Sequence, residues 1–340
     1  MKIHQILLPA FAIKYEKPIL PLEEEDQFKT GVHENFNEVR LYKKHFVAVL
    51  SDGLAFSNNR KLFEMTSRTQ VVNNINRKIL YELIRTRIKR YRFVENAILV
   101  FDDWSGNYFH FWNDLMPRLY LCRHLVAKKK LTILVNGKTE IIARTIFPLL
   151  GFHNLKYITY DQLCLVANLY YPEFITPHVG SFHEATMRNM KEFVFKKLSV
   201  KHNSCRNLRL YISRSKAQHR KVINEDDLSE ILVEFGFKIV FAEEYTALEQ
   251  IHLFKDAEAV MGLHGAGLSN MLFCKEGTKV IELRQRGGVQ NNLFYQLAST
   301  LGHPYYCYFS EQAVTTDFQQ SDIHVEPVNL TRFLSAIFSK

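Results

Sequence analysis

One stretch near the end of the chain, residues 257–283, most limits what this sequence can fold into. It begins with an apolar strand pattern at Ala257–Met261, passes through three closely spaced glycines, and continues as a helical run over Leu268–Phe273. After Gly277 an apolar strand pattern returns at Lys279–Leu283. Strand, glycine-rich turn, helix and strand make one βαβ unit, and such a turn lies at the carboxyl edge of the sheet, where open α/β sheets bind ligands.

The turn itself, His264-Gly265-Ala266-Gly267, fits no standard fingerprint. Its glycines follow neither G-x-G-x-x-G nor the P-loop spacing, and an oxyanion loop fails because the chain has no G-x-S-x-G. Glycines let the backbone approach a ligand, and the N–H groups of the following helix attract phosphate. A tight turn with an incidental histidine explains this stretch alone equally well.

Length and composition favour an ordinary globular protein. The 340 residues are enough for two domains, and 47% hydrophobic with 23% charged residues argue against disorder. No apolar run approaches the ~20 residues of a membrane span. The first residues lack a complete signal-peptide pattern, and the widely scattered cysteines show no C-x-x-C. We therefore expect no zinc site, no disulfide framework and a cytoplasmic location.

The net charge of +9 comes partly from two basic stretches, Arg85–Arg92 and Lys128–Lys130. Solvated helix faces are the simpler explanation of both. Otherwise they favour an anionic partner, such as a phosphorylated acceptor or the surface of an anionic membrane. Nucleic acid is not expected, because no nucleic-acid-binding motif accompanies the charge.

Strand and helix patterns alternate along the chain and divide it into domains. Residues 1–95 are poorly defined, with two short strands expected near Leu41 and Phe46–Leu50. Alternation of buried strands and helices then predicts parallel sheets. We predict an N-terminal Rossmann-like domain over 1–175, an interdomain helix and linker over 176–204, a C-terminal ligand-binding domain over 205–325 and a final helix over 326–340.

Two regions resemble a known family. Gly106-Asn-Tyr-Phe-His-Phe-Trp-Asn-Asp-Leu-Met-Pro-Arg118 is similar to a segment of glycosyltransferase family 61. Tyr211-Ile-Ser-Arg214, then Arg220-Lys-Val-Ile-Asn-Glu225 and the His264–Asn270 stretch, resemble the C-terminal half of that family in the same order. The resemblance covers roughly residues 96–310.

This resemblance implies a GT-B-like α/β fold, with two Rossmann-like domains whose parallel sheets face each other across a cleft. It also implies inverting transfer from a nucleotide sugar, usually a UDP-sugar such as UDP-GlcNAc or UDP-xylose. We expect the bacterial surface-polysaccharide type, acting in capsule synthesis on a glycan or lipid-linked acceptor at the inner face of the plasma membrane. No cofactor is expected besides the donor.

The donor diphosphate needs positive charge and free N–H groups, and the C-terminal half offers both. Arg214 follows a strand, Arg220 and Lys221 share its loop, and the Gly265–Gly267 turn can complete one anion pocket. His264 can bond a phosphate oxygen. Glu282, near a strand end, can accept ribose hydroxyls, or can simply face water.

The catalytic base is expected on the helix that opens near Asn107. His110 and Asp114 lie four residues apart on one face of it, with Asn107 and Asn113 nearby and Asp103 in the preceding loop. We favour Asp114 as base with His110 orienting it, and the reverse assignment is the second choice. Aromatic neighbours such as Trp112 exclude water from a site, or simply pack the core.

Two other functions stay open at this point. A homologue that binds a nucleotide sugar or glycan without catalysis fits the same residues, and so does a nucleotide-sugar epimerase of the GT-B fold. No D-x-D or H-E-x-x-H motif occurs, and the adjacent pairs Asp102-Asp103 and Asp226-Asp227 point to opposite faces if extended. We therefore predict that catalysis needs no metal.

Overall fold

In a computed structural model the chain divides into two units. The structure describes residues 2–16, 18–19, 28, 33–57, 88–176, 180–203, 208–286, 291–312 and 322–338. Unit 1 comprises residues 1–11 and 35–177, and unit 2 comprises residues 12–34 and 178–340. The predicted boundary at 175 lies close to the observed division at 177. Residues 12–34, expected in the first domain, belong instead to unit 2, as does the helix expected between the domains.

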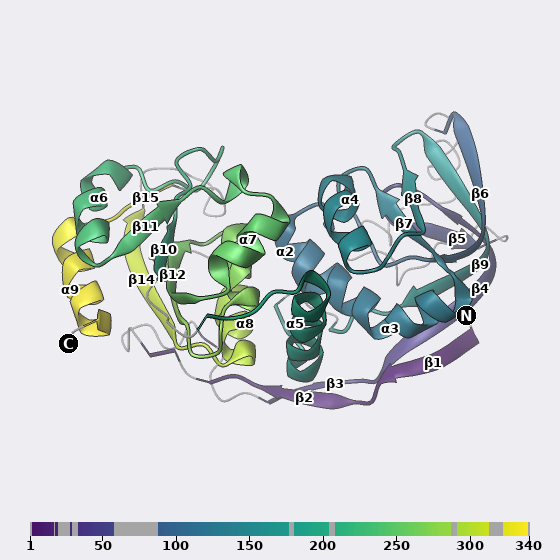
Figure 1. Ribbon diagram of the computed structural model, residues 1–340, viewed down its shortest axis with the longest axis horizontal. Helices are drawn as coiled ribbons and strands as arrows, with labels where there is room; N and C mark the ends of the chain where they lie inside the picture. Colours follow the sequence, from purple (N-terminus) through teal and green to yellow (C-terminus); the bar gives the residue numbers. More distant parts are fainter. Residues whose placement is uncertain are drawn as a thin grey trace. The chain divides into compact units, whose positions relative to one another are not determined.

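Unit 1 is built on a mixed sheet, which has seven strands among the described residues (Figure 1). The strand order is β1-β4-β9-β6-β7-β8, and β5 pairs with β4. The strands are β1 (Lys2–Leu8), β4 (Val39–Val49), β5 (Ala55–Ser57), β6 (Arg90–Ile98), β7 (Thr132–Asn136), β8 (Leu155–Ile158) and β9 (Gln162–Pro172). The helices are α2 (Tyr108–His110), η4 (Phe111–Leu115), α3 (Met116–Lys129) and α4 (Glu140–Leu149).

The parallel sheet predicted for the first domain is therefore only half correct. Strands β9, β6, β7 and β8 run parallel, whereas β1, β4 and β5 add antiparallel ladders. The two short strands predicted near Leu41 and Phe46 are one strand, β4, in which Phe46 has a left-handed φ of 52° and is skipped by the ladder to β9. Antiparallel pairing to β9, far along the chain, continues on both sides of Phe46, which joins the two predicted segments into one strand.

The basic stretches have different surroundings. Residues 85–87 lie outside the described residues, but Arg90–Arg92 belong to β6 and not to a helix face. Arg90 pairs with Asp161 at 2.8 Å. Lys128–Lys130 end α3 and are exposed, as a solvated helix end should be. Cys122, Cys164, Cys274 and Cys307 are buried, and Cys205 lies outside the described residues. Within the described ranges, no helix is both long and apolar enough to cross a membrane.

Unit 2 is a doubly wound α/β unit. Its sheet runs β11-β10-β12-β13-β14-β15, with β15 antiparallel to the five parallel strands. The strands are β10 (Leu208–Ile212), β11 (Phe237–Val240), β12 (Ala257–Leu263), β13 (Lys279–Gln285), β14 (Tyr305–Gln312) and β15 (Ile323–His324). The helices are α5 (Glu184–Leu198), α6 (Glu225–Glu234), η5 (Ala242–Glu244), α7 (Ala247–Phe254), η6 (Ala266–Phe273), α8 (Leu293–Leu301) and α9 (Pro327–Phe338). A short ladder of β2 (Phe11–Lys14) with β3 (His33–Phe36) contains the division between the units.

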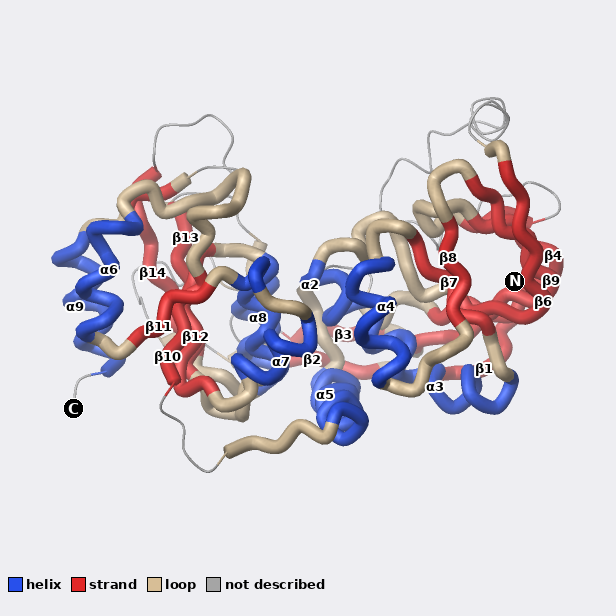
Figure 2. The backbone as a smooth tube through the Cα atoms, turned by 45° about the horizontal axis from the view of Figure 1, so that its top comes forward, coloured by secondary structure: helices blue, strands red, loops and turns tan. Residues whose placement is uncertain are grey.

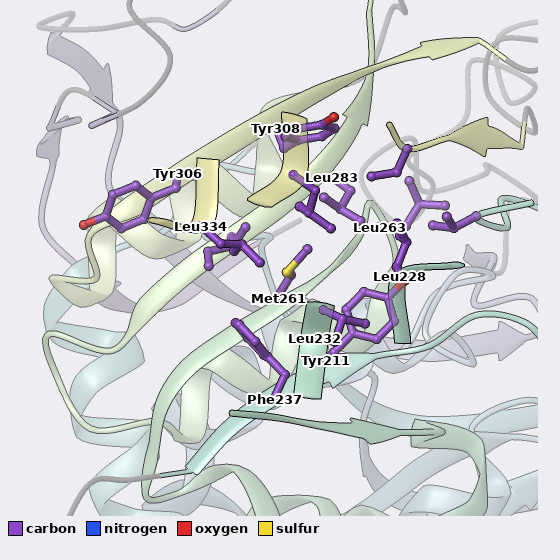
Figure 3. Packing of buried hydrophobic residues seen from close by; sticks show 14 of the residues in the cluster. Tyr211, Leu228, Leu232, Phe237, Met261, Leu263, Leu283, Tyr306, Tyr308 and Leu334 are labelled. Atoms are coloured by element: carbon purple, nitrogen blue, oxygen red, sulfur yellow. The ribbon is translucent and has the colours of Figure 1, made fainter. Parts of the chain in front are cut away.

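Helices cover both faces of the unit 2 sheet (Figure 2). Figures 1 and 2 have α6 and α9 on one side and α7 and α8 on the other. The α6/α9 side is a continuous apolar core, in which Leu228, Leu232 and Leu334 pack on Met261 and Leu283 of the central strands (Figure 3). The apolar residues whose i, i+3, i+4, i+7 spacing predicted α6 form the face of the helix that packs on this core. The final helix, α9, is therefore part of the unit 2 core and not a separate appendage.

Candidate active site

The strand order of unit 2 creates a ligand-binding position at one place. Numbered along the chain, its five parallel strands run 2-1-3-4-5 across the sheet, so the order reverses between β10 and β12. These two strands are hydrogen-bonded neighbours, with Ile212 opposite Gly262 at their carboxyl ends. The loops after them leave the sheet in opposite directions, which opens a crevice where doubly wound folds bind ligands. Arg214 follows β10, and the glycine turn follows β12.

Arg214 organises the loop after β10. Its Nε donates to the carbonyl of Arg220 and its Nη2 to the carbonyl of His219, both at 2.9 Å. A Cβ placed on Gly265 would lie 2.5 Å from Nη1 of Arg214. Gly265 is in extended backbone with a φ of −179°, so its function is space and not an unusual φ. The glycine after His264 is needed because the guanidinium lies against the turn.

The loop after β10 brings together two guanidinium groups that are only partly exposed to solvent. Arg214 and Arg220 are both half-buried, and Arg220 has a left-handed φ of 59°. Burial lowers the pKa of both guanidinium groups, and the charge of Arg220 lowers that of Arg214 further. Such like charges are stabilised by an anion between or beside them. Lys221 also lies in this loop, where its backbone N–H donates to Asp322 Oδ1 at 2.8 Å.

The helix that follows the glycine turn is a 3-10 helix, η6, and not an α-helix. Its first internal bond runs from the N–H of Leu268 to the carbonyl of Gly265, at 3.0 Å. The N–H groups of Ala266 and Gly267 precede that bond, so the helix itself does not use them. Both residues are partly exposed. They supply N–H donors at the same strand end as the two arginines.

His264 is hydrogen-bonded to a buried carboxylate, that of Glu282. Its Nδ1 hydrogen-bonds Glu282 Oε1, and the hydroxyl of Tyr305 donates to Glu282 Oε2. Glu282 is 1% exposed and His264 is 7% exposed. Burial alone would raise the pKa of Glu282, but His264, the Arg284 charge and the Tyr305 hydroxyl together hold it below its ordinary value. The expectation of a water-facing Glu282 is therefore wrong.

Glu282 was also expected to accept ribose hydroxyls. Both of its oxygens already accept hydrogen bonds, one from His264 and one from Tyr305. Binding of ribose by Glu282 stays a prediction, and these contacts do not favour it. The hydrogen bond fixes the chemistry of His264. A carboxylate only accepts, so the proton of the neutral ring is on Nδ1 and Nε2 is an acceptor. His264 can donate to a phosphate only as an imidazolium, for which Glu282 is the counterion.

Unit 1 carries a second candidate site, at the start of its long helix. Asn107 caps that helix by accepting from the N–H of Phe109 at 2.8 Å. The next turn widens into a π-helical segment over Phe111–Leu115, whose C-terminal neighbour Met116 donates from its N–H back to the carbonyl of Phe111. Such π segments often occur at functional sites because they re-aim side chains. His110 Nδ1 and Asp114 Oδ2 are 2.6 Å apart across it.

An open cavity of about 620 Å³ lies over this turn, within the size range of small-molecule sites. The residues that line it are Asp103, Trp104, Gly106, Asn107, His110 and Lys138. His110 thus lines the cavity, and Asp114 bonds Nδ1 of its ring. Asn113 does not join them. It is 5% exposed, and its Nδ2 donates to the carbonyl of Phe109 in the preceding turn at 3.0 Å.

Three lining residues were missed by sequence reasoning: Trp104, Gly106 and Lys138. The strands β6 and β7 are parallel neighbours, so the loops after their carboxyl ends meet. Lys138 follows β7 directly after the turn Asn136-Gly137, and this placement was the available signal. Among the described residues, no group of three or more His, Cys, Asp or Glu side chains is arranged to hold a metal ion.

Comparison with known proteins decides the family. The model of the family described as Glycosyltransferase 61 matches residues 108–281, half of the chain. The chain belongs to glycosyltransferase family 61. The match begins one residue after the cap of the His110 helix and ends one residue before Glu282. It contains His110 and Asp114 of the first site and Arg214, Arg220 and His264 of the second, but not the loop Asp103–Asn107 or Glu282.

Two curated relatives of this family member come from Oryza sativa subsp. japonica. The chain is 22% identical over 219 residues to alpha-1,3-arabinosyltransferase XAT3 and 21% identical over 220 residues to alpha-1,3-arabinosyltransferase XAT2. Each alignment covers 59% of this chain, but only 38% and 37% of the relatives. The chain therefore spans less than two fifths of the length of the curated relatives that it matches.

Proposed function

We propose that the chain transfers a sugar from a nucleotide-sugar donor, a UDP-sugar by analogy with its family, to a glycan acceptor with inversion at the anomeric carbon. The meeting of Arg214, Arg220 and His264 at the reversal of strand order carries this proposal, because those groups match a diphosphate. Family membership supports the same reaction. The GT-B domain arrangement, a role in capsule synthesis, a lipid-linked acceptor, a cytoplasmic location and contact with an anionic membrane stay predictions.

The diphosphate of the donor binds at the carboxyl ends of β10 and β12. Arginine forks and backbone N–H groups are strong phosphate ligands, and the N–H groups of Ala266 and Gly267 precede a helix. His264, as an imidazolium over Glu282, donates to a phosphate oxygen. These groups stabilise the negative charge that develops on the leaving diphosphate when the bond to the sugar breaks.

The acceptor hydroxyl is activated by His110. Its oxygen attacks the anomeric carbon while its proton passes to Nε2 of His110, and the bond from that carbon to the donor phosphate breaks. Asp114 accepts from Nδ1, which orients the ring and stabilises the imidazolium that forms. This assignment reverses the one favoured from sequence, because His110 and not Asp114 lines the cavity.

The test of this function is a panel of nucleotide sugars with the purified chain. The panel compares three UDP-sugars, UDP-GlcNAc, UDP-xylose and UDP-arabinose, with GDP- and CMP-sugars. UDP-arabinose is included because of the names of the two rice relatives. A ligand at 100 times its dissociation constant stabilises by about 2.7 kcal/mol, enough to raise the melting temperature measurably. Release of free sugar from the stabilising donor indicates transfer chemistry, whereas an isomerised donor would indicate an epimerase.

Arg214→Ala is expected to lower UDP affinity by about ten- to a hundredfold, because a charge-assisted phosphate contact is worth roughly 1.5–3 kcal/mol. Isothermal calorimetry measures the change. Arg214 also holds two loop carbonyls, so Gly265→Ala is the companion variant: its added Cβ would displace the guanidinium without removing it. Gly137→Ala, where a Cβ meets nothing within 4 Å, is the control. Unchanged UDP affinity in both site variants would place the donor elsewhere.

Transfer is expected to continue in the presence of EDTA. The arginines, the imidazolium and the backbone N–H groups supply the charge stabilisation that a divalent ion gives in metal-dependent transferases. The measurement is the initial rate of sugar release or transfer with EDTA, and again after addition of Mg²⁺ or Mn²⁺. A rate abolished by EDTA and restored by either ion would contradict metal-independent transfer.

A further inference from the structure

One of the tryptophans, Trp104, is exposed to solvent at the unit 1 cavity. The chain has two tryptophans, and they differ sharply: Trp112 is fully buried, whereas Trp104 is 37% exposed and lines the cavity. Burying a large aromatic ring is strongly favourable, so a tryptophan left exposed inside a concave site marks a binding surface. The proposed transfer chemistry makes no use of Trp104.

The loop that carries Trp104 is fixed by its own hydrogen bonds. Asp102 Oδ1 accepts from the N–H of Trp104 at 3.0 Å and from the hydroxyl of Ser105 at 2.7 Å. The carbonyl of Trp104 accepts from the N–H of Asn107, the helix cap, at 2.9 Å. The indole is therefore presented by an ordered turn, so a ligand that binds to it does not have to order the loop.

The indole lies beside the proposed base. The centroids of the Trp104 and His110 rings are 5.1 Å apart, with a tilt of 50° between the planes. Both rings line the same cavity. A ligand ring that stacks one face on the indole therefore brings the substituents at its edge within reach of the imidazole.

Two oppositely charged residues at the rim of the cavity, Lys138 and Asp103, form an ion pair, so together they add no net charge. Lys138 Nζ is 2.7 Å from Asp103 Oδ1, and both side chains are exposed. A Cβ on Gly106 would lie 2.4 Å from Cβ of Lys138, so the lysine stem packs directly over that glycine. The pair offers hydrogen-bond donors and acceptors together, which suits hydroxyl groups better than a phosphate or a carboxylate.

We propose that this cavity binds a neutral sugar residue of the acceptor, stacked through its C–H face on Trp104, with one hydroxyl directed to His110 and others to the Asp103–Lys138 pair. The inference rests on the proposed glycosyl transfer and names its acceptor class. A phosphorylated lipid headgroup or an acidic glycan would meet the Asp103 carboxylate. A peptide hydroxyl would offer no ring face to the indole.

Intrinsic fluorescence tests the inference directly, because Trp104 is the solvent-exposed one of the two tryptophans. The probes are xylotetraose, cellotetraose and chitotetraose as neutral glycans, tetragalacturonate as an acidic glycan and glycerol phosphate as a headgroup. We expect at least one neutral probe, and neither acidic probe, to change the emission of the wild-type chain. In Trp104→Phe that change disappears, while calorimetry with the same probe still detects binding.

Trp104→Ala is expected to weaken binding of that neutral probe by about tenfold, the scale of one aromatic stacking contact, and to leave UDP affinity unchanged. Phe93→Ala, which removes an exposed aromatic ring that does not line the cavity, should change neither. In Asp103→Asn the lysine loses its counterion, so tetragalacturonate should begin to bind.

Three results would overturn the acceptor site. These are no response of the wild type to any neutral probe, a response only to the acidic probes, and equal probe affinity in Trp104→Ala and the wild type. UDP calorimetry on the wild-type chain separates this from the proposed function. UDP binding with an unresponsive Trp104 rejects the acceptor site alone, whereas glycan binding at Trp104 without any nucleotide binding rejects the transfer function.

Discussion

His110→Ala is expected to lower the turnover of sugar transfer by about 10²–10⁴-fold, the usual cost of losing a general base. UDP affinity should stay nearly unchanged, because the proposed base takes a proton from the acceptor hydroxyl and does not bind the donor diphosphate. The physical reason is the geometry of the imidazole. Nδ1 is committed to Asp114 at 2.6 Å, so the remaining nitrogen is the one that can receive a proton in the cavity. Single-turnover rates with saturating donor measure the effect.

Asp114→Asn also lowers turnover under this assignment, because an amide cannot stabilise the imidazolium, so the loss alone does not identify the base. Chemical rescue separates the two residues. Added imidazole should restore part of the activity of His110→Ala and none of that of Asp114→Asn. Rescue of Asp114→Ala by formate, with no imidazole effect on His110→Ala, would identify Asp114 as the base, as the sequence first suggested.

The alternation of strands and helices in unit 2 could be predicted from sequence. Each of its parallel strands is a short apolar run between polar turns, and each α-helix has a periodic apolar face, so local pattern and burial agree. The predicted strand Lys238–Phe241, for example, is β11, Phe237–Val240. Since parallel strands present their carboxyl ends at one edge, the meeting of Arg214 with the glycine turn followed from order along the chain.

The strands and helices of unit 1 could be predicted less well from sequence, for a physical reason. Its β4 is stabilised by antiparallel pairing with β9, more than a hundred residues later, and this pairing leaves no periodic trace in the sequence of β4. The π-helical turn was also invisible. It shifts a hydrogen bond by one residue within an aromatic run that has no clear period, although His110 and Asp114 still make the i, i+4 contact that their spacing predicted.

Glu282 shows why a site residue can be identified but misjudged. Sequence placed it near the end of an apolar strand, where either a ligand or water was expected beyond it, whereas β13 runs on to Gln285 and Glu282 is its central residue. Its two actual partners are His264, 18 residues earlier, and Tyr305, 23 residues later. Both contacts depend on neighbouring strands of the folded sheet, and the register that joins Gly262 to Glu282 and Glu282 to Cys307 cannot be derived from local pattern.

Glu282→Ala is expected to destabilise unit 2 by about 3–5 kcal/mol, because it leaves the buried Arg284 and His264 without their carboxylate. Glu276→Ala is the matched control. It removes a carboxylate from an exposed pair with Arg188, which is worth about 1 kcal/mol or less. Hydrogen exchange of the amides in β12 and β13 measures the stability of unit 2 separately from unit 1. Equal losses in the two variants would contradict a structural role for the buried carboxylate.

The isosteric variant Glu282→Gln adds a test in pH. The pKa of Glu282 is lowered in the folded chain, so its charge stabilises the fold above the ordinary glutamate pKa, and that stability is lost as the pH falls through the folded value. The stability difference between wild type and Glu282→Gln should therefore be full at neutral pH and shrink on acidification. UDP affinity should fall in the same variant, because His264 loses the counterion of the imidazolium that donates to phosphate. A stability difference that is constant from neutral to acidic pH would mean that the carboxylate acts through shape and not through charge.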